Sequence, residues 1–444
     1  MTQALFPRNF HKSYPEAGRG EGCFLFTAGG KKILDACGGA AVVTIGHGVR
    51  EIGRAMAEQA ERLAYAHTSQ FHTRIAEELA GRLLALAPPN FREGGRVYFT
   101  SGGSEATETA LKLCRQYFLE RDDRKRVRVV SRWQSYHGST LGALAVSGNV
   151  RRRTPFAPLL HEWGHIPPCY CYRCPLGLTY PSCDVACADE LEKLLRSTNA
   201  ETVAAFICEP VVGATLGAAA PPDGYLQRIA EICRRNGILL IADEVMTGMG
   251  RTGKPFACEH WGVAPDIILV GKGIASGYAP LGAVLVAGHL AEAIAKGSGA
   301  FLHGFTYSAH PVATAAGIAV LDYIERNQLF ARVAPAGRQV RDALEMLKKF
   351  RIVGDLRGLG LLLGIEFVRE RATREPFPRE AGIAGRVYEA AFAAGVLTYP
   401  IQGCADGERG DHILLAPPYT ISAEEIQLLA RGLEAALTIV EKSL

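Results

Sequence analysis

The sequence has no apolar run near the roughly 18 residues that a membrane-spanning helix needs, no low-complexity segment and no repeat of fixed period. Pro7, Arg8 and Asn9 interrupt the start, where a signal peptide has a continuous apolar stretch. Charge of either sign is not in excess, with 49 Lys and Arg against 45 Asp and Glu. These absences argue against a membrane, secreted or nucleic-acid-binding protein. We therefore predict a cytoplasmic enzyme, and we interpret the basic cluster 151–153 as solvated surface.

Short apolar runs alternate with longer helical stretches through the middle of the chain. The run 238–242 is apolar on both faces, which is typical of a strand covered by helices on both sides. The alternation predicts an α/β fold with a mostly parallel sheet. The expected strands are 96–100, 127–131, 204–208, 238–242, 267–270 and 282–287.

From about residue 322 the pattern changes to long amphipathic helices, over 333–349, 381–394 and 423–441, with short strands such as 361–367 between them. This predicts a smaller α+β domain. The glycine-rich segment 24–48 is too short to fold alone, and we expect it to pack with the C-terminal part. The predicted division is 1–50 for the N-terminal part of the small domain, 51–321 for the large domain and 322–444 for the C-terminal part of the small domain.

A glycine-rich turn, Ser101-Gly102-Gly103-Ser104, follows the first of these strands and opens a helix. Ser104 is predicted to be the N-cap of that helix. Backbone N–H groups at the positive end of a helix dipole suit a phosphate. A purely structural turn explains the same residues, and the spacing differs from the known nucleotide-binding motifs.

Two further strand ends carry charged residues. Asp243 and Glu244 follow a buried strand, where an unpaired carboxylate costs several kcal/mol. We therefore expect a cationic partner for Asp243, with helix capping or metal ligation as alternatives. Lys272 stands between Gly271 and Gly273, and burial there would lower its pKa and free the amine for Schiff-base chemistry. A surface lysine at a strand end is the alternative.

A phosphate-binding turn, a buried aspartate and a glycine-flanked lysine together are what pyridoxal 5′-phosphate (PLP) requires. With these motifs the sequence resembles the class III family of PLP-dependent aminotransferases, of fold type I, over almost the whole chain. The resemblance implies a large PLP-binding domain with a mostly parallel sheet and a smaller α+β domain. The motifs that carry it are 101–106, Tyr136-His137-Gly138, Glu209-Pro210, Asp243-Glu244-Val245, 250–253, Gly271-Lys272-Gly273 and 303–307.

The resemblance also implies a role for each matching residue. Lys272 matches the lysine that binds PLP through a Schiff base and moves the proton, and Asp243 matches the partner of the pyridine nitrogen. Thr306 is similar to the threonine that reaches the phosphate of the neighbouring subunit, which implies a homodimer with shared active sites. Further cofactor contacts are expected at Gly103, Ser104, Tyr136, His137, Glu209 and Val245.

The reaction that the resemblance implies moves an amino group from a donor amine to a 2-oxo acid in two half-reactions, with ping-pong kinetics. Leu414 stands where family members with a fixed arginine for an α-carboxylate carry it, and Met246 replaces a common glutamine. Both changes indicate a primary amine, a diamine or an ω-amino acid as donor, with pyruvate or 2-oxoglutarate as acceptor. Other class III PLP chemistry (aminomutase, decarboxylase or phospho-lyase) and a non-catalytic scaffold are the alternatives.

The substrate contacts are expected at Arg409, Phe24 and Trp133. An oxo-acid acceptor needs a cation, and Arg409 is the candidate near the position at which related chains carry a mobile arginine. Phe24 and Trp133, together with Phe71, fall in regions that line the substrate entrance of the family. Core packing explains these aromatic residues equally well.

Twelve cysteines are many for a chain expected in a reducing compartment. Five of them lie within the nineteen residues 169–187. Cys171, Cys174, Cys183 and Cys187 have spacings from which a zinc site can be built. Disulfides or unligated thiols are the alternatives.

Overall fold

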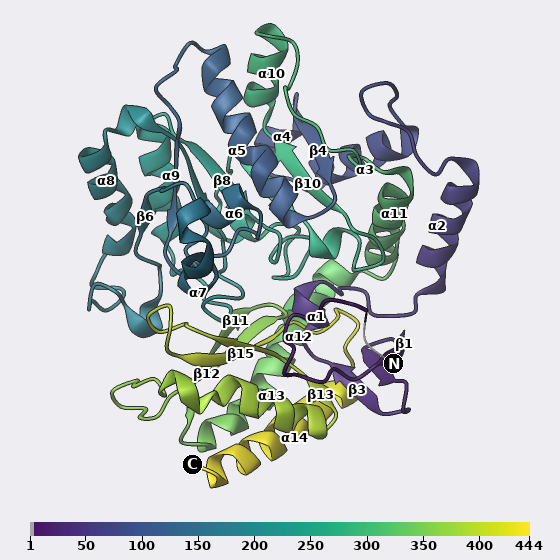
Figure 1. Ribbon diagram of the computed structural model, residues 1–444, viewed down its shortest axis with the longest axis vertical. Coiled ribbons are helices and arrows are strands. Elements are labelled where there is room, and N and C mark those ends of the chain that lie inside the picture. Colours follow the sequence, from purple (N-terminus) through teal and green to yellow (C-terminus); the bar gives the residue numbers. More distant parts are fainter. Residues whose placement is uncertain (1–3) are drawn as a thin grey trace.

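A seven-stranded sheet forms the centre of the larger part of the molecule, in the computed structural model that describes residues 4–444 (Figure 1). Its order is β4-β10-β9-β8-β7-β5-β6. Neighbouring strands are parallel except β10, which is antiparallel to both β4 and β9. This confirms the predicted α/β architecture. The strands are β4 (Arg96–Thr100), β5 (Arg128–Arg132), β6 (His165–Ile166), β7 (Val203–Cys208), β8 (Leu239–Asp243), β9 (Ile267–Val270) and β10 (Gly282–Val286).

Helices cover this sheet because its central strands are apolar on both faces, as the fully buried strands β7, β8, β9 and β10 show. No helix within residues 4–444 combines the length and the apolarity required to cross a membrane. The helices of this part of the chain are α1 (Gly38–Ala41), α2 (Arg50–Arg62), α3 (Arg74–Leu86), α4 (Pro89–Arg92), α5 (Gly103–Glu120), α6 (Leu141–Val146), α7 (Val150–Arg153), α8 (Ala186–Thr198), α9 (Tyr225–Arg235), α10 (Gly288–Lys296) and α11 (Pro311–Arg326).

Two smaller sheets lie below it in Figure 1. One has the order β1-β2-β3-β13, in which β13 pairs in parallel with β3, so the beginning of the chain contacts the C-terminal part. The other has the order β11-β12-β15-β14. The division into domains at residues 50 and 322 is kept as a proposal, and residues 1–3 of its first segment lie outside the described residues. The elements are β1 (Ala17–Glu21), β2 (Phe24–Thr27), β3 (Lys32–Asp35), α12 (Leu329–Leu344), β11 (Val353–Leu359), β12 (Leu362–Phe367), α13 (Ile383–Ala393), β13 (Val396–Leu397), β14 (Tyr399–Gln402), β15 (Asp411–Leu415) and α14 (Ala423–Lys442).

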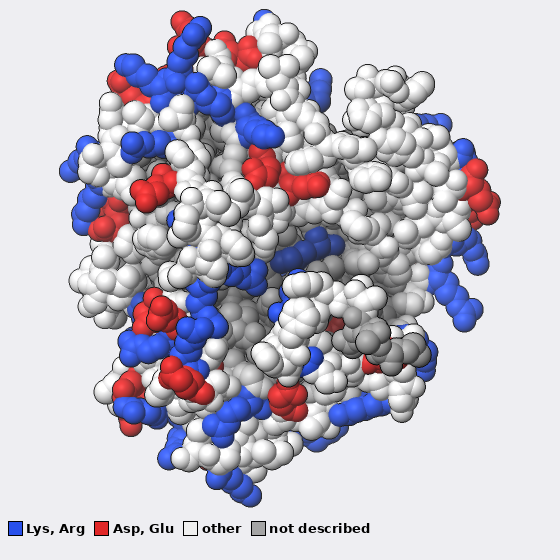
Figure 2. Space-filling model, viewed as in Figure 1, with Lys and Arg blue, Asp and Glu red and all other residues white. Residues whose placement is uncertain are grey.

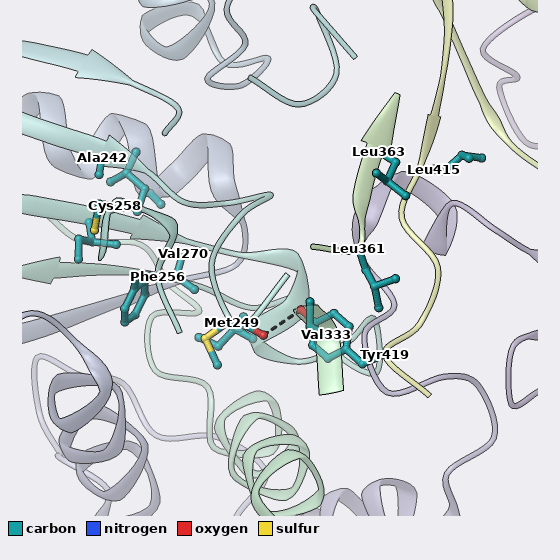
Figure 3. Close-up of a cluster of buried hydrophobic side chains, with 14 of the residues drawn as sticks. Ala242, Met249, Phe256, Cys258, Val270, Val333, Leu361, Leu363, Leu415 and Tyr419 are labelled. Carbon is teal, nitrogen blue, oxygen red and sulfur yellow. Dashed lines mark hydrogen bonds between the residues drawn. The ribbon is translucent and has the colours of Figure 1, made fainter. Parts of the chain in front are cut away.

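A continuous hydrophobic core joins the large sheet to the C-terminal sheet (Figure 3). Ala242 and Val270 come from the large sheet, and Leu363 and Leu415 come from the C-terminal one. Between them the Tyr419 hydroxyl donates a hydrogen bond to the carbonyl oxygen of Met249, at 2.9 Å. The segment that follows Asp243 is therefore fixed by packing from both sheets.

Arg251 is fully buried between the same two parts. Its guanidinium donates to the carbonyl oxygens of Leu361 (3.2 Å), Pro417 (2.5 Å) and Val43 (3.0 Å). These three oxygens come from segments that are far apart in the sequence, so one side chain connects the beginning, the middle and the end of the chain.

Replacing Arg251 by leucine is expected to lower the free energy of unfolding by about 3 kcal/mol or more, because three buried carbonyl groups lose their donor. Denaturant unfolding of the purified proteins measures this. Arg326→Leu is the matched control, since Arg326 pairs with Glu51 on the surface and such pairs contribute about 0–1 kcal/mol. Equal losses for the two variants would contradict the structural role given to Arg251.

Candidate active site

The polar residues that follow the central strands meet at one edge of the large sheet, where the carboxyl ends of the parallel strands lie. They surround a cavity of about 310 Å³. On the face drawn in Figure 2, the surface is hollowed between the large-sheet part and the C-terminal part, and Lys and Arg side chains lie in the hollow. The predicted cofactor contacts that line the cavity are Gly103, Ser104, Tyr136, His137, Glu209, Asp243, Val245 and Lys272.

Asp243 is the last residue of β8 and is buried. Its Oδ2 lies 2.7 Å from Nδ1 of His137, and its Oδ1 accepts a hydrogen bond from the backbone N–H of Val245 at 3.1 Å. The sequence indicated that the Asp243 carboxylate needs a partner, and within this chain that partner is His137. Nε2 of His137 is also buried and has no hydrogen-bond partner among the described residues.

Glu209 follows β7 and connects the cavity to a buried arginine. Arg132 donates to the carbonyl oxygen of Glu209 at 2.5 Å and lies 3.4 Å from its Oε2. Oε1 of Glu209 accepts the backbone N–H of Tyr136 at 3.0 Å. Glu209 thus fixes the backbone on which Tyr136 and His137 stand.

Lys272 lies two residues beyond β9 with φ 46°, in the left-handed region that non-glycine residues seldom adopt. Such conformations persist where the surroundings hold them, and they occur often at functional sites. Burial lowers the pKa of Lys272 to about 8, although the Asp243 carboxylate acts in the opposite direction. A larger fraction of Lys272 is therefore neutral near pH 8 than of an ordinary lysine.

The glycines beside Lys272 permit close packing. A Cβ atom on Gly271 would lie 3.2 Å from Cγ1 of Val245, and one on Gly273 would lie 3.0 Å from Cγ2 of Thr44. A side chain at position 271 would push against Val245, which lines the cavity, and one at position 273 would push against Thr44, so the two glycines let the Lys272 backbone pack closely there.

The glycine-rich turn after β4 leads into α5, which begins at Gly103 with Gly102 as its N-cap. The prediction that Ser104 caps the helix is wrong: Ser104 is the second helical residue, and its hydroxyl accepts the N–H of Ser139 at 3.1 Å. A Cβ atom on Gly103 would lie 2.9 Å from Cγ1 of Val245. The first turn of α5 can approach Val245 only because Gly103 has no side chain.

These residues fit PLP. The N-terminus of α5 offers N–H groups to a phosphate, and the buried Asp243 carboxylate suits a protonated ring nitrogen. Nε2 of His137, which has no hydrogen-bond partner among the described residues and lies 3.9 Å from Oε2 of Glu209, adds a buried polar atom at the same place. Lys272 supplies an amine whose pKa is lowered by burial.

Glu244, the neighbour of Asp243, has a different role. It is fully buried and accepts the backbone N–H groups of Ala257 (3.0 Å) and Cys258 (2.8 Å) as well as the Thr247 hydroxyl. Burial raises the pKa of Glu244, while these donors act against the rise. Its contacts hold the loop after β8 in place and do not reach the cavity.

Other predicted contacts lie away from the cavity lining of this chain. Thr306 is exposed, and its carbonyl oxygen accepts the Tyr65 hydroxyl at 2.7 Å. Arg409 is exposed and pairs with Asp406 at 2.7 Å. The three aromatic candidates are also outside the lining: Phe24 lies under the Lys32 ammonium, Trp133 stacks on His165, and Phe71 is exposed. Their roles stay predictions.

The residues that hold the cavity-lining residues in place were not predicted from the sequence. Arg132 holds Glu209, Ser139 joins Ser104 to the Tyr136 hydroxyl (2.8 Å), and Thr107 donates to the carbonyl oxygen of His137 at 2.7 Å. None of these three supporting residues, Arg132, Ser139 and Thr107, lies in a sequence pattern that indicates such a role. The one available signal was Arg132 at the end of a predicted buried strand, where an arginine requires partners.

The zinc site proposed for Cys171, Cys174, Cys183 and Cys187 is not supported. Within residues 4–444, no group of three or more His, Cys, Asp or Glu side chains is placed to hold a metal ion. Cys171 is exposed on a short 3₁₀ turn, whereas Cys187 lies in the first turn of α8 and contacts Cys169 instead. The spacings resemble those of zinc loops, but in the described residues these four thiols do not form a metal-binding group.

Comparison with known proteins agrees with this site. Residues 6–437 match the model of the family described as aminotransferase class III. A relative from Bacillus subtilis, the uncharacterized aminotransferase YodT, is 38% identical over 445 residues, covering 100% of this chain and 99% of the relative.

Solved structures give the same result. An (S)-enantioselective omega-transaminase from Thermomicrobium roseum superposes with a TM-score of 0.91 at 38% identity, covering 99% of this chain and 96% of that one. An amine transaminase from an uncultivated Pseudomonas species, solved in a PLP-bound form, has a TM-score of 0.91 at 37% identity and covers 99% and 98% of the two chains. PLP is accordingly the cofactor that the family implies, and the fold type I architecture is confirmed.

The lowered pKa of Lys272 predicts how cofactor uptake depends on pH. Only the neutral amine attacks a carbonyl group, so the rate at which the cofactor-free protein captures PLP should rise with pH and level off above about pH 8. Growth of the yellow absorption band after mixing measures the rate. Asp243→Asn removes a charge that raises the pKa of Lys272, so its profile should shift to lower pH. A rate that still rises beyond about pH 10, as for an unperturbed lysine, would contradict this.

Proposed function

Since this chain belongs to the class III aminotransferases, we propose that it takes an amino group from a primary amine, a diamine or an ω-amino acid and transfers it to pyruvate or 2-oxoglutarate. The single observation that carries the choice of donor is the apolar wall of the cavity. Met246 lines it, and the cavity lining among the described residues contains no arginine. Leu414, at the position where a fixed arginine would stand, is fully buried in β15 and packs in the core.

The chemistry divides among this chain's own residues. When bound, PLP supplies an electron sink for the carbon from which a proton is removed. Asp243 would hold the proton of the ring nitrogen, and His137 Nδ1 lies 2.7 Å from that carboxylate and fixes it. Lys272 would hold the cofactor through its amine and would move the proton to and from the substrate carbon. Tyr136 and Val245 both line the cavity, and they would contact the two faces of the ring. One site serves both half-reactions, which supports ping-pong kinetics.

The acceptor brings a carboxylate, which requires a cation near the cavity. Helix α7 carries three consecutive arginines, and two of them are occupied. Arg151 donates to Oε1 of Gln402 at 3.2 Å, and Arg153 donates to the carbonyl oxygens of Leu144, Ala145 and Ser147. Both are half-buried, so residues 151–153 are only partly the solvated surface expected from the sequence.

Among residues 4–444 the Arg152 guanidinium has no carbonyl or carboxylate partner, whereas its backbone N–H donates to Oδ1 of Asn149 at 3.1 Å. Its guanidinium lies over the ring of Tyr136, with Cζ 4.5 Å from the ring centroid. Besides burial, its charge contributes to lowering the pKa of Lys272, which is the electrostatic effect of a cation near the cavity. We propose Arg152 as the residue that receives the acceptor carboxylate, in preference to the Arg409 predicted from the sequence.

A homodimer is part of the same proposal. Thr306 lies outside the cavity of its own chain and is exposed. An exposed Thr306 is available to a second copy of the chain, where it would reach the phosphate of the partner's cofactor. The mass of the purified protein in solution tests this directly.

The function is tested with a panel of amines against both oxo-acids on the PLP-loaded protein. We expect alanine or glutamate to form at the rate at which a primary amine, diamine or ω-amino acid is consumed. Lys272→Ala is expected to lower turnover about a thousandfold or more, because it removes the proton-transferring group. Ammonia or carbon dioxide released without any acceptor would favour the alternative class III chemistries over transamination.

The role of Arg152 is tested by separating the two substrates. Arg152→Gln should raise KM for pyruvate or 2-oxoglutarate about tenfold to a hundredfold, since a charge-assisted hydrogen bond contributes about 1.5–3 kcal/mol. KM for the amine donor should stay the same, as should KM for an aldehyde acceptor without a carboxylate. Arg409→Gln and Arg151→Gln are matched controls that remove the same charge nearby. A raised oxo-acid KM in Arg409→Gln alone would assign the carboxylate to Arg409 instead.

A further inference from the structure

The cysteine-rich insertion, residues 169–187, has no part in the site described above, since none of its cysteines lines the cavity. It runs from just after β6, the edge strand of the large sheet, to the first turn of α8 (Figure 1). The chain carries twelve free thiols, five of them in this insertion. Buried cysteines elsewhere are accounted for by packing, whereas the insertion places several thiols at or near the surface.

Cys169 and Cys187 form a pair. The two sulfur atoms are 3.8 Å apart, within hydrogen-bond distance for a pair of thiols. Cys169 is 2% exposed and packs among the apolar residues between β6 and α8, while Cys187 is partly exposed. A disulfide needs the sulfur atoms at about 2.05 Å, so the pair has to close by about 1.8 Å. One member is thus accessible to a reagent, and the other is held beside it.

We propose that Cys169 and Cys187 are a reversible oxidation site that peroxides convert from a dithiol to a disulfide. The proposal does not depend on the amine or oxo-acid substrates. Cytosolic disulfides are usually transient and redox-sensing where they occur.

The reaction needs only the two thiols and the peroxide. The Cys187 thiolate attacks one peroxide oxygen, so that a sulfur–oxygen bond forms, the oxygen–oxygen bond breaks and one water leaves after protonation. The Cys169 thiol then attacks Sγ of Cys187: the sulfur–sulfur bond forms, the sulfur–oxygen bond breaks and a second water leaves. The two thiols are oxidised by two electrons, and the peroxide is reduced by two. A dithiol reductant reverses the step.

The surroundings favour the thiolate that starts this reaction. Hydrogen bonding to Cys169 lowers the pKa of Cys187, with a smaller contribution from the charge of the buried Arg132, while burial and the charge of Cys171 act against the lowering. Hydrogen bonding to Cys169 also lowers the pKa of the exposed Cys171, to about 7. Cys169 keeps its proton, because its hydrogen bonds to Cys171 and Cys187 raise its pKa, so it is the resolving thiol.

The segment that follows Cys169 is also held against the C-terminal sheet. Immediately after Cys169, the Tyr170 hydroxyl donates to Glu366 of β12, and Nε of Arg173 lies 2.7 Å from Oε1 of Glu366. A disulfide to Cys187 therefore ties α8 to a segment that is already docked on the C-terminal sheet. Because the bond would also restrict the unfolded chain, the oxidised protein should unfold at a higher temperature.

The experiment uses the PLP-loaded protein titrated with hydrogen peroxide at low molar ratios. Thiols counted after denaturation are expected to fall from twelve to ten, and dithiothreitol should restore them. Peptide mapping without reduction should show a single cross-link between Cys169 and Cys187. In Cys169→Ser the reaction should stop at a sulfenic acid on Cys187 that dimedone labels.

Two further variants keep the proposal falsifiable if the buried substitution prevents folding. Cys187→Ser changes the partly exposed member and should abolish both the cross-link and the rise in unfolding temperature. Cys174→Ser changes a cysteine of the same insertion outside the pair and should retain both effects. Thiol loss without the Cys169–Cys187 cross-link, or a cross-link that joins Cys171, Cys174 or Cys183, would overturn the assignment. Neither result bears on transamination, which is measured separately in the reduced protein.

Discussion

A carboxylate buried at the carboxyl end of β8 is the constraint on which the site depends. Asp243 has little access to water, so its charge has to be balanced by groups held at fixed positions. His137 and the N–H of Val245 meet part of that requirement, and a protonated cofactor ring would meet the rest. Residues behind the site are needed to hold His137 in position. Glu209 fixes the backbone on which His137 stands, and Arg132 in turn holds Glu209.

How much of this could be predicted from the sequence depended on whether the signal was local. The strands 96–100 and 267–270 have the bounds predicted from the sequence. Asp243 could be singled out because a charged residue directly after such a run is unusual, and Lys272 because two glycines flank it just beyond another run. Their convergence follows from the parallel sheet, since the carboxyl ends of its strands share one edge. The predicted N-cap of α5 was wrong by two residues, because Gly102 and Ser104 are both acceptable caps and packing against Val245 decides between them.

Contacts between distant parts of the chain could not be predicted in this way. Arg132 meets Glu209 across 77 residues, and nothing near either residue indicates the other. Arg152 could not be distinguished from its two neighbours in the sequence, because three consecutive arginines are all consistent with solvated surface charge. The fold gives hydrogen-bond acceptors to the side chains of Arg151 and Arg153. For the cysteines, spacing alone suggested a metal site, whereas their places in the fold bring Cys169 and Cys187 together and leave Cys171 exposed.

The position of Arg251 also bears on how this protein is made. Its guanidinium binds carbonyl oxygens of Val43, Leu361 and Pro417, and a ribosome synthesises the last of these after most of the chain has emerged. Until then the loop after β8 holds a cation that lacks one of its acceptors, and the hydrophobic core between the two parts is open. Final assembly is therefore delayed until translation is nearly complete, and a nascent chain arrested before Pro417 would expose apolar surface to chaperones.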